Sequence, residues 1–441
     1  MPVTYVCDHA WLPEGVRDDV AITVDGGTIS AITVGQSTVG QSAAGPRLTG
    51  LTLPGFANAH SHAFHRALRG RTHEGRGSFW TWREQMYLVA DRLDPDSYHR
   101  LARAVYAEMA LAGVTSVGEF HYLHHAPGGK PYADPNAMGE ALLAAAAEAG
   151  IRITLLDTLY LQAGVDGKPL AGPQLRFGDG SIDGWADRFD ALAARPGSLI
   201  GAALHSVRAV PAEVMTDFAE LTGGLPVHAH VAEQVDEVAA CRQVHGCTPT
   251  ELLDRHGLLE ETFTSVHATH LTRGDIDLMA DSFACFCPTT ERDLGDGIGP
   301  ARALADAGVR LTLGSDSHAV IDLIEEARAL ELDERLATQE RGHFTQEELL
   351  SAATAAGHAS LGWHSAGSLA AGRRADLVTI SLDTPRTAGV DPGGVLMAAS
   401  ANDVTHVVVD GQVVVAEGRH VRVDVARELT ESLSLLATRR V

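Results

Sequence analysis

Apolar segments of strand length alternate with helical segments from about residue 51 onward, and this alternation constrains the fold most. The eight strand candidates are Leu53–Ala57, Ser116–Phe120, Ile151–Leu156, Ile200–Leu204, Val227–Val231, Thr264–His267, Phe283–Phe286 and Arg310–Leu313. Helical stretches such as Asp94–Leu111 and Pro135–Ala149 lie between them. Eight such repeats are typical of a (β/α)8 barrel of the TIM type. A doubly wound sheet also alternates, but it normally opens with a glycine-rich phosphate loop. His60-Ser61-His62 stands there instead, so we predict the barrel.

Short β-type runs occupy both ends of the chain. Before the alternating region they are Ala21–Val24 and Thr28–Thr33, and after it Ala375–Ser381, Val404–Asp410 and Gln412–Ala416. Asp410-Gly411 is typical of a tight hairpin turn. Since 441 residues exceed one ordinary core, we predict an α/β protein of two domains. Residues 1–50 and 366–441 would form a small β-sandwich domain, and residues 51–365 the barrel.

Charge and cysteine content narrow the partners and the compartment. The formal net charge of −23 disfavours nucleic acid or an anionic membrane as a partner, because like charges repel. No apolar stretch is long enough to span a bilayer, and no signal peptide is evident. The five cysteines are odd in number and widely spaced, which is typical of free thiols in a reducing cytosol. We therefore expect a cytoplasmic protein.

Side chains that can bind a metal or move protons follow four of the predicted strands. In chain order they are His60 and His62, His230 and Glu233, His267 or His270, and Asp316. Because the carboxyl ends of barrel strands share one face, these side chains should lie close together. One His-x-His pair is a weak signal, but four strands that end in nitrogen and oxygen ligands predict a metal centre.

Metal-assisted hydrolysis is the chemistry that suits this set. Neutral imidazoles and a carboxylate bind Zn²⁺ or a similar ion and leave one position for water. The ion lowers the pKa of that water from about 15.7 towards 7. Asp316 can accept the water proton, and Glu233 can carry it to a leaving nitrogen. His267 can polarise the carbon under attack.

This pattern resembles the amidohydrolase superfamily, as does the stretch Gly-Ser-Leu-Ala-Ala-Gly-Arg-Arg-Ala-Asp-Leu-Val at 367–378. Two-metal members bridge their ions with a carboxylated lysine on strand 4, but Ser198–Leu204 contains no lysine, and Lys168 lies in a loop. The one-metal deaminase branch, marked here by His230-x-x-Glu233, is the better match. The resemblance implies a homodimer with one divalent ion per chain, zinc by expectation. The implied ligands are His60, His62, His230 and Asp316.

Four further stretches narrow the resemblance to the formimidoylglutamate deiminases. They are residues 78–87, 119–125, 205–210 and 287–298. The substrate-binding residues implied by this resemblance are Arg83, Tyr122, His205 and Arg208. His65 stands where that family usually has glutamine, and its ring could also contact the substrate. The implied reaction converts N-formimidoyl-L-glutamate, a dianionic amino-acid derivative of histidine degradation, into N-formyl-L-glutamate and ammonia.

The two arginines support an anionic substrate independently of the resemblance, because guanidinium groups pair bidentately with carboxylates. Two other functions stay open. A deaminase of a nucleobase or nucleoside, such as cytosine, guanine or S-adenosylhomocysteine, would use the same metal centre. Its neutral or zwitterionic substrate would not need both Arg83 and Arg208. A noncatalytic scaffold would be expected to have lost metal ligands, and here the whole set is present.

Overall fold

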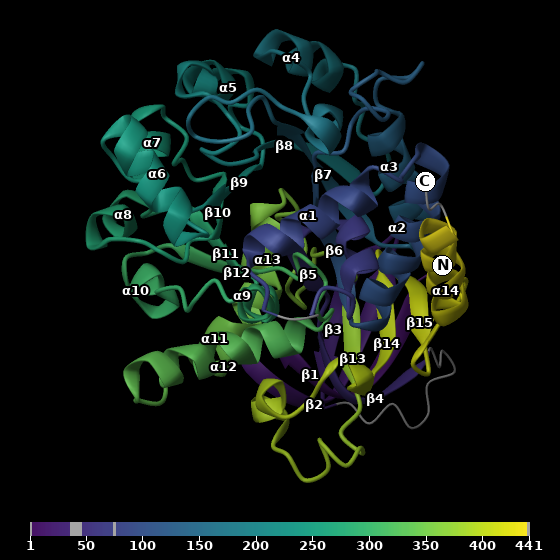
Figure 1. Ribbon diagram of the computed structural model, residues 1–441. Helices are drawn as coiled ribbons and strands as arrows, with labels where there is room; N and C mark the ends of the chain where they lie inside the picture. The colour runs from purple at the N-terminus through teal and green to yellow at the C-terminus, as the bar shows by residue number, and fades with distance from the viewer. Residues whose placement is uncertain (1, 36–45, 74–75, 439–441) are drawn as a thin grey trace.

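The computed structural model describes residues 2–35, 46–73 and 76–438. Its centre is a parallel eight-stranded sheet in the order β12-β11-β10-β9-β8-β7-β6-β5, which curves into a nearly closed barrel ringed by helices (Figure 1). The bridge between Ser61 and Asp316 joins the first strand to the segment that follows the last. The barrel strands are β5 (Phe56–Ser61), β6 (Val114–His121), β7 (Arg152–Leu159), β8 (Ser198–Leu204), β9 (Val227–Val231), β10 (Phe263–His267), β11 (Phe283–Phe286) and β12 (Arg310–Leu313). The predicted (β/α)8 barrel is confirmed.

Helices connect the strands, and most of them cover the outside of the barrel. They are α1 (Phe79–Ala90), α2 (Pro95–Leu111), α3 (Ala137–Ala149), α4 (Ile182–Asp190), α5 (Met215–Leu221), α6 (Val235–His245), α7 (Pro249–Arg255), α8 (Arg273–Leu278), α9 (Pro288–Leu294), α10 (Ala301–Asp306), α11 (Leu323–Thr338), α12 (Gln346–Ala353), α13 (Ala355–Ser360) and α14 (Val425–Thr438). Helix α2 begins as the sequence predicts, since Asp94 caps it by accepting a hydrogen bond from the Ser97 amide. No helix in the described ranges combines the length and apolarity that crossing a bilayer requires.

A second eight-stranded sheet combines strands from both ends of the chain. In Figure 1 the purple N-terminal and yellow C-terminal strands lie side by side, below the barrel. Its strands are β1 (Val3–Leu12), β2 (Gly15–Asp25), β3 (Thr28–Val34), β4 (Arg47–Pro54), β13 (Leu377–Ile380), β14 (Val404–Val409), β15 (Gln412–Ala416) and β16 (Arg419–His420). Strand β4 joins the two ends, since it pairs with β1 on one side and β13 on the other. The small β unit built from both ends is thus confirmed, whereas the boundaries at residues 50 and 365 stay predictions.

The hairpin between β14 and β15 turns at Asp410 and Gly411, as predicted. Both residues have positive φ, 47° and 76°. This is the backbone conformation that a two-residue type I′ turn requires.

The first barrel strand was predicted three residues too early at its start and four residues too early at its end. The apolar run expected to form one strand over Leu53–Ala57 is split at Gly55 between β4 and β5. A side chain at Gly55 would lie 2.4 Å from the Thr115 hydroxyl, so only glycine lets the chain pass here from one sheet to the other. The shift matters for function, because it places His60 inside β5 rather than beyond its end.

A buried ion pair fastens the barrel to the second sheet. Arg152 of β7 donates from Nη1 to Oδ1 of Asp376 at 2.9 Å, and from Nη2 to the other carboxylate oxygen. Asp376 immediately precedes β13 and also accepts a hydrogen bond from the Asp410 amide. Both charged side chains are about 1% exposed, so their charges compensate each other away from water.

Candidate active site

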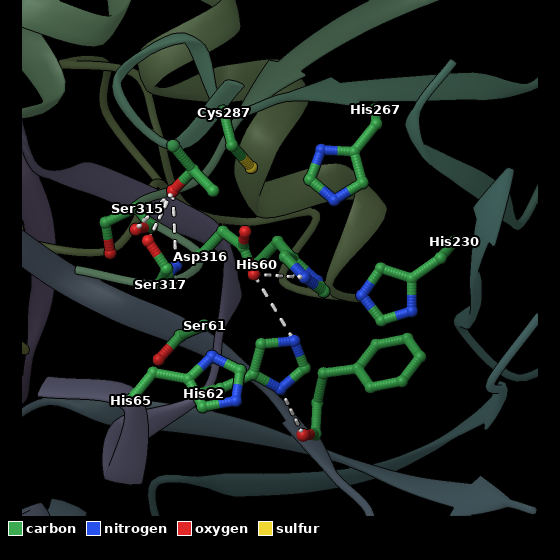
Figure 2. A network of polar contacts seen from close by, with 12 residues as sticks. His60, Ser61, His62, His65, His230, His267, Cys287, Ser315, Asp316 and Ser317 are labelled. Carbon is green, nitrogen blue, oxygen red and sulfur yellow. Dashed lines mark hydrogen bonds and ion pairs between the residues drawn. The ribbon is translucent and has the colours of Figure 1, made fainter. Parts of the chain in front are cut away.

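Four imidazole rings and one carboxylate converge at the carboxyl end of the barrel strands. Figure 2 shows the rings of His60, His62, His230 and His267 turned towards a common space beside Asp316. Nε2 of His60 lies 3.2 Å from Oδ1 of Asp316, and Nε2 of His62 lies 3.3 Å from the same oxygen. Potential ligand atoms of His60, His230, His267 and Asp316 all lie within 4.8 Å of one another. The arrangement could hold a metal ion.

Backbone hydrogen bonds fix the tautomers of two of these rings. Nδ1 of His62 donates to the Phe120 carbonyl at 2.9 Å, and Nδ1 of His230 donates to the His205 carbonyl at 2.9 Å. A carbonyl can only accept, so in both rings Nδ1 carries the proton and Nε2 keeps its lone pair. Within the described residues Nδ1 of His60 has no hydrogen-bond partner, and its Nε2 contacts only Asp316, although the ring is fully buried. A histidine that binds a metal through one ring nitrogen usually donates a hydrogen bond from the other nitrogen, as Nδ1 of His62 and of His230 does here.

Burial and neighbouring charges set the protonation of the group. Burial lowers the pKa of His62 to about 3, aided by the charge that His60 can carry. Burial alone would raise the pKa of Asp316, but its contacts with the imidazoles of His60, His267 and His62 hold that pKa well below the usual range. Neutral imidazoles beside an ionised carboxylate are the forms that bind a divalent cation.

His267 differs from the other rings because acidic groups surround it. Its Nδ1 lies 3.3 Å from Oε1 of Glu291, and its Nε2 lies 3.8 Å from Oε1 of Glu233. Burial favours the neutral ring, but Glu233, Glu291 and Asp316 together outweigh burial and raise the pKa of His267 to about 10. His267 is therefore the imidazole best suited to carry a positive charge towards a reacting group.

Strained backbone accompanies these side chains. His267 and Asp316 both have positive φ, 69° and 36°, as does His318 at 59°. This backbone conformation is unfavourable for residues other than glycine. Such strain is common at active sites and ligand-binding sites, where the surrounding structure fixes the side chain. Here the amide and carbonyl of Asp316 are held by β5, since they bond to the His60 carbonyl and the His62 amide.

A pocket of about 600 Å³, including its open mouth, lies directly over the convergent group. Helix α1 lies across the barrel in Figure 1 and supplies one wall. Arg83 on this helix is stacked on the ring of Trp80, 4.6 Å from its centre. Arg208 comes from the loop after β8, and its guanidinium lies 5.3 Å from the centre of the Phe79 ring. Two cationic groups therefore stand above the floor of histidines and carboxylates.

Arg208 also contacts the acidic floor. Its Nη2 donates to Oε2 of Glu233 at 3.0 Å, and its Nε lies 3.7 Å from Oε1 of Glu237. Elsewhere in the lining of the pocket, Nε2 of His65 and the hydroxyl of Tyr122 are hydrogen-bonded at 2.9 Å. Nδ1 of His65 is buried and has no hydrogen-bond partner in the part of the chain that the structure describes. The His65 ring itself lines the pocket.

The sequence model of the amidohydrolase family matches residues 51–414. The chain belongs to this family. A formimidoylglutamate deiminase from Pseudomonas aeruginosa is 39% identical over 388 residues, which cover 83% of this chain and 85% of that protein. A 5-methylthioadenosine/S-adenosylhomocysteine deaminase from Natronomonas pharaonis is 30% identical, over 84% of this chain and 83% of its own length.

Solved structures resemble this amidohydrolase over almost its whole length. An amidohydrolase from Brucella melitensis matches with a TM-score of 0.89 and 33% identity, covering 99% of this chain and all of that one. A mutant of an atrazine chlorohydrolase from Arthrobacter aurescens, complexed with zinc and atraton, matches with a TM-score of 0.86. At 23% identity this second match supports the fold alone.

The amidohydrolase structure brings the predicted site residues together. All except His60 line the same pocket, and His60 lies beneath it against Asp316. Of the two histidines left open after the sixth strand, His267 faces the group, whereas His270 is not part of it. Lys168 is 75% exposed and paired with Asp166, so it is not a bridging metal ligand. The individual roles of the predicted residues stay predictions.

Two buried carboxylates beside the site were not predicted. Glu291, on α9, accepts hydrogen bonds from His267 and from the Cys287 amide. Glu237, on α6, accepts one from the Glu233 amide at 3.2 Å. Both lie in the first turn of a helix, where acidic residues are ordinary caps for free amide groups. Their position in the sequence therefore gave no sign of a contact with the site.

Proposed function

We propose that this amidohydrolase hydrolyses N-formimidoyl-L-glutamate to N-formyl-L-glutamate and ammonia. The observation that carries the proposal is that two arginines, Arg83 and Arg208, line the pocket above a floor of imidazoles and carboxylates. Guanidinium groups bind carboxylates, of which this substrate has two at one end. The likeness to the deiminase from Pseudomonas aeruginosa supports the same substrate.

We propose that His60, His62, His230 and Asp316 hold one divalent ion, Zn²⁺ by preference. The donor set fits, because three neutral imidazoles and one carboxylate are typical zinc ligands. The carbonyl contacts of His62 and His230 leave Nε2 of each ring free to coordinate. When bound, such an ion makes hydroxide available near neutral pH by lowering the pKa of a coordinated water.

Three side chains then handle the charge and the protons. Asp316 accepts a proton from the attacking water as the water oxygen bonds to the formimidoyl carbon. Glu233 relays that proton to the terminal nitrogen as the carbon–nitrogen double bond becomes single. The hydroxyl proton of the resulting adduct follows to the same nitrogen, a carbon–oxygen double bond forms, the bond between that nitrogen and the carbon breaks, and ammonia leaves. His267, hydrogen-bonded to the carboxylate of Glu291, stabilises the charge that develops at the reacting centre. The formyl group remains on the amino acid, so atoms and protons balance.

The upper wall of the pocket binds the amino-acid part of the substrate. Arg83 and Arg208 pair with its two carboxylates. Tyr122 and His205 lie against each other, with ring centres 5.4 Å apart, and offer a phenol and an imidazole to the same part of the molecule. The free Nδ1 of His65 is a further hydrogen-bonding group for the substrate. These five residues are the proposed substrate-binding set.

The second candidate function is deamination of a nucleobase or nucleoside. It is favoured by relatives such as the 5-methylthioadenosine/S-adenosylhomocysteine deaminase from Natronomonas pharaonis. The two arginines argue against it, because a base or nucleoside offers them no pair of carboxylates.

The decisive experiment measures ammonia release from N-formimidoyl-L-glutamate beside cytosine, guanine, adenosine and S-adenosylhomocysteine. We expect turnover of the formimidoyl compound alone, and its loss after chelation. Turnover of a base or nucleoside without turnover of the formimidoyl compound would establish the second candidate instead. Metal analysis of the purified protein tests the stoichiometry, since two tightly held ions per chain contradict the proposed centre.

We propose further that the enzyme is a cytoplasmic homodimer that binds neither nucleic acid nor membranes. The acidic net charge supports the absence of polyanionic partners. The five cysteines are all free and buried, which suits a reducing compartment. Light scattering of the purified protein tests the dimer.

A further inference from the structure

A buried arginine with uncharged partners lies behind the substrate pocket. Arg176 ends the 3-10 helix η2 (Gly172–Arg176), and its side chain is fully buried. Its Nε donates to the His125 carbonyl at 2.7 Å, its Nη1 to the Ala90 carbonyl, and its Nη2 to the Leu93 carbonyl at 2.7 Å. The Tyr132 hydroxyl lies 3.4 Å from Nη2. Within the described ranges, every hydrogen-bond partner of this guanidinium is neutral.

Among the described residues, the other two buried arginines have acidic partners, as does Arg208 of the pocket. Arg152 pairs with Asp376, Arg188 with Asp157, and Arg208 with Glu233. An ion pair offsets part of the cost of removing a guanidinium from water, whereas carbonyls compensate it less completely. Burial accordingly lowers the pKa of Arg176, although Tyr132 and the charges of Asp91 and Asp94 nearby partly oppose this shift. An apolar residue would fill this space at a lower cost in free energy. The presence of a guanidinium here must therefore have a reason other than stability.

That reason is geometric, because the guanidinium joins three segments that each carry a wall of the pocket. Ala90 is the last residue of α1, which carries Arg83. His125 ends the short stretch that begins with Tyr122, and its amide is itself bound by the Arg176 carbonyl at 2.9 Å. Phe177 follows Arg176 directly, and its ring centre lies 5.0 Å from that of Tyr122.

The guanidinium is planar and has five N–H donors, so it suits the binding of several carbonyls from separate segments better than any other side chain does. The carbonyls at the end of a helix lack partners within the helix, so the end of α1 is where an outside donor can hold it. Apolar contacts alone would allow α1 to slide, whereas directed hydrogen bonds fix its position relative to the β6 loop.

We propose that Arg176 is a positioning residue for substrate binding. By binding the carbonyls of Ala90, Leu93 and His125, it sets the distance between Arg83 on α1 and Tyr122 after β6. In this proposal it contacts neither the substrate nor the residues that hold the metal ion. The inference rests on the proposed function, in which Arg83 and Tyr122 both bind the amino-acid part of the substrate.

Steady-state kinetics of two variants test the inference. Arg176→Lys keeps the charge but loses the fork, and Arg176→Met keeps much of the volume but loses every hydrogen bond. We expect both to raise KM for N-formimidoyl-L-glutamate about tenfold or more, because small misplacements of binding groups are costly. We expect kcat to change less than about threefold and metal content to stay the same, since the floor of the site is untouched.

Arg152→Lys is the matched control, because Arg152 is equally buried but lies at the junction with the second sheet. It should lower Tm and leave KM within about twofold of the wild-type value. If KM is unchanged in folded Arg176→Lys, or rises equally in Arg152→Lys, Arg176 has no special positioning role.

Hydrogen exchange of the wild-type protein provides a test that does not depend on folded variants. Saturating N-formyl-L-glutamate, the proposed product, should protect residues 79–93, 122–126 and 172–177 together, since one side chain joins them. Protection of α1 without the other two segments contradicts the inference. Failure of the wild type to release ammonia from the formimidoyl compound refutes the proposed function itself, and the two failures are therefore distinguishable.

Discussion

Arg83 and Arg208 face the same pocket but differ in what else they contact, and this difference makes a sharp prediction. Arg83 is stacked on Trp80, whereas Arg208 donates a hydrogen bond of 3.0 Å to Glu233. In the proposed reaction both bind a substrate carboxylate, but only Arg208 also orients the group that protonates the leaving nitrogen. Replacing each by methionine should therefore give different kinetic results.

The expected magnitudes follow from the contacts that each replacement removes. A hydrogen bond between charged groups contributes about 1.5–3 kcal/mol, which corresponds to roughly 10- to 150-fold in affinity. Arg83→Met should raise KM by a factor in this range and leave kcat within about threefold. Arg208→Met should raise KM similarly and also lower kcat about tenfold or more, because Glu233 loses the donor that orients it.

Ammonia release measured over a range of substrate concentrations separates the two parameters. Metal content and Tm of each variant show whether the site is intact. Arg427→Met on α14 is a suitable control, because this arginine is exposed and its ion pairs with Asp424 and Glu431 lie on the surface. An unchanged KM in both pocket variants removes the arginines from the site. An equal loss of kcat in both would falsify the special coupling of Arg208 to Glu233.

Three more perturbations test other parts of the structure. Glu291→Gln removes the charge beside Nδ1 of His267, so kcat should fall about tenfold or more while KM changes little, as steady-state assays can measure. Dialysis against a chelator should abolish ammonia release, and one equivalent of Zn²⁺ per chain should restore it. Asp376→Asn leaves the guanidinium of Arg152 buried without its full counter-charge, so denaturant unfolding should report a loss of about 3–5 kcal/mol. Burial would raise the pKa of Asp376, but Arg152 outweighs burial and lowers it. The stabilisation is therefore present above the unfolded-state pKa of about 3.9 and lost as the pH falls towards the folded value, and the variant should lack this acid-dependent loss.

The barrel could be predicted because its signal is repeated eight times along the chain. Each apolar strand is followed by a helix, and an error in one strand does not change the class of fold. The one misplaced strand arose because Leu53 and Phe56 belong to a single apolar run that serves two sheets. Pro54-Gly55 is a dipeptide typical of a break between strands, but the contacts that require glycine there come from Thr115 and Asp376, far along the chain.

The candidate site was predictable only where strand geometry determines position. Side chains at the carboxyl ends of parallel barrel strands must share one face, so His60 and Asp316 could be placed together from the sequence alone. Glu291 and Arg176 could not, because each acts from a segment whose direction depends on how a loop folds. A buried arginine that binds carbonyls has no partner of opposite charge in the sequence that would reveal it.

The distribution of charge within the pocket supports both the metal proposal and the choice of substrate. The floor carries the carboxylates of Asp316, Glu233 and Glu291 close together, and Arg208 is paired with only one of them. In addition to the positive charge that His267 can carry, a divalent cation would compensate these buried carboxylates. At the mouth the local charge is positive, because the guanidinium of Arg83 faces the ring of Trp80 rather than a carboxylate. N-formimidoyl-L-glutamate has the same polarity, since its amidine end is cationic when protonated and its amino-acid end carries two carboxylates. The field of the pocket would therefore direct the amidine towards the acidic floor, whereas a neutral purine would gain nothing from this gradient.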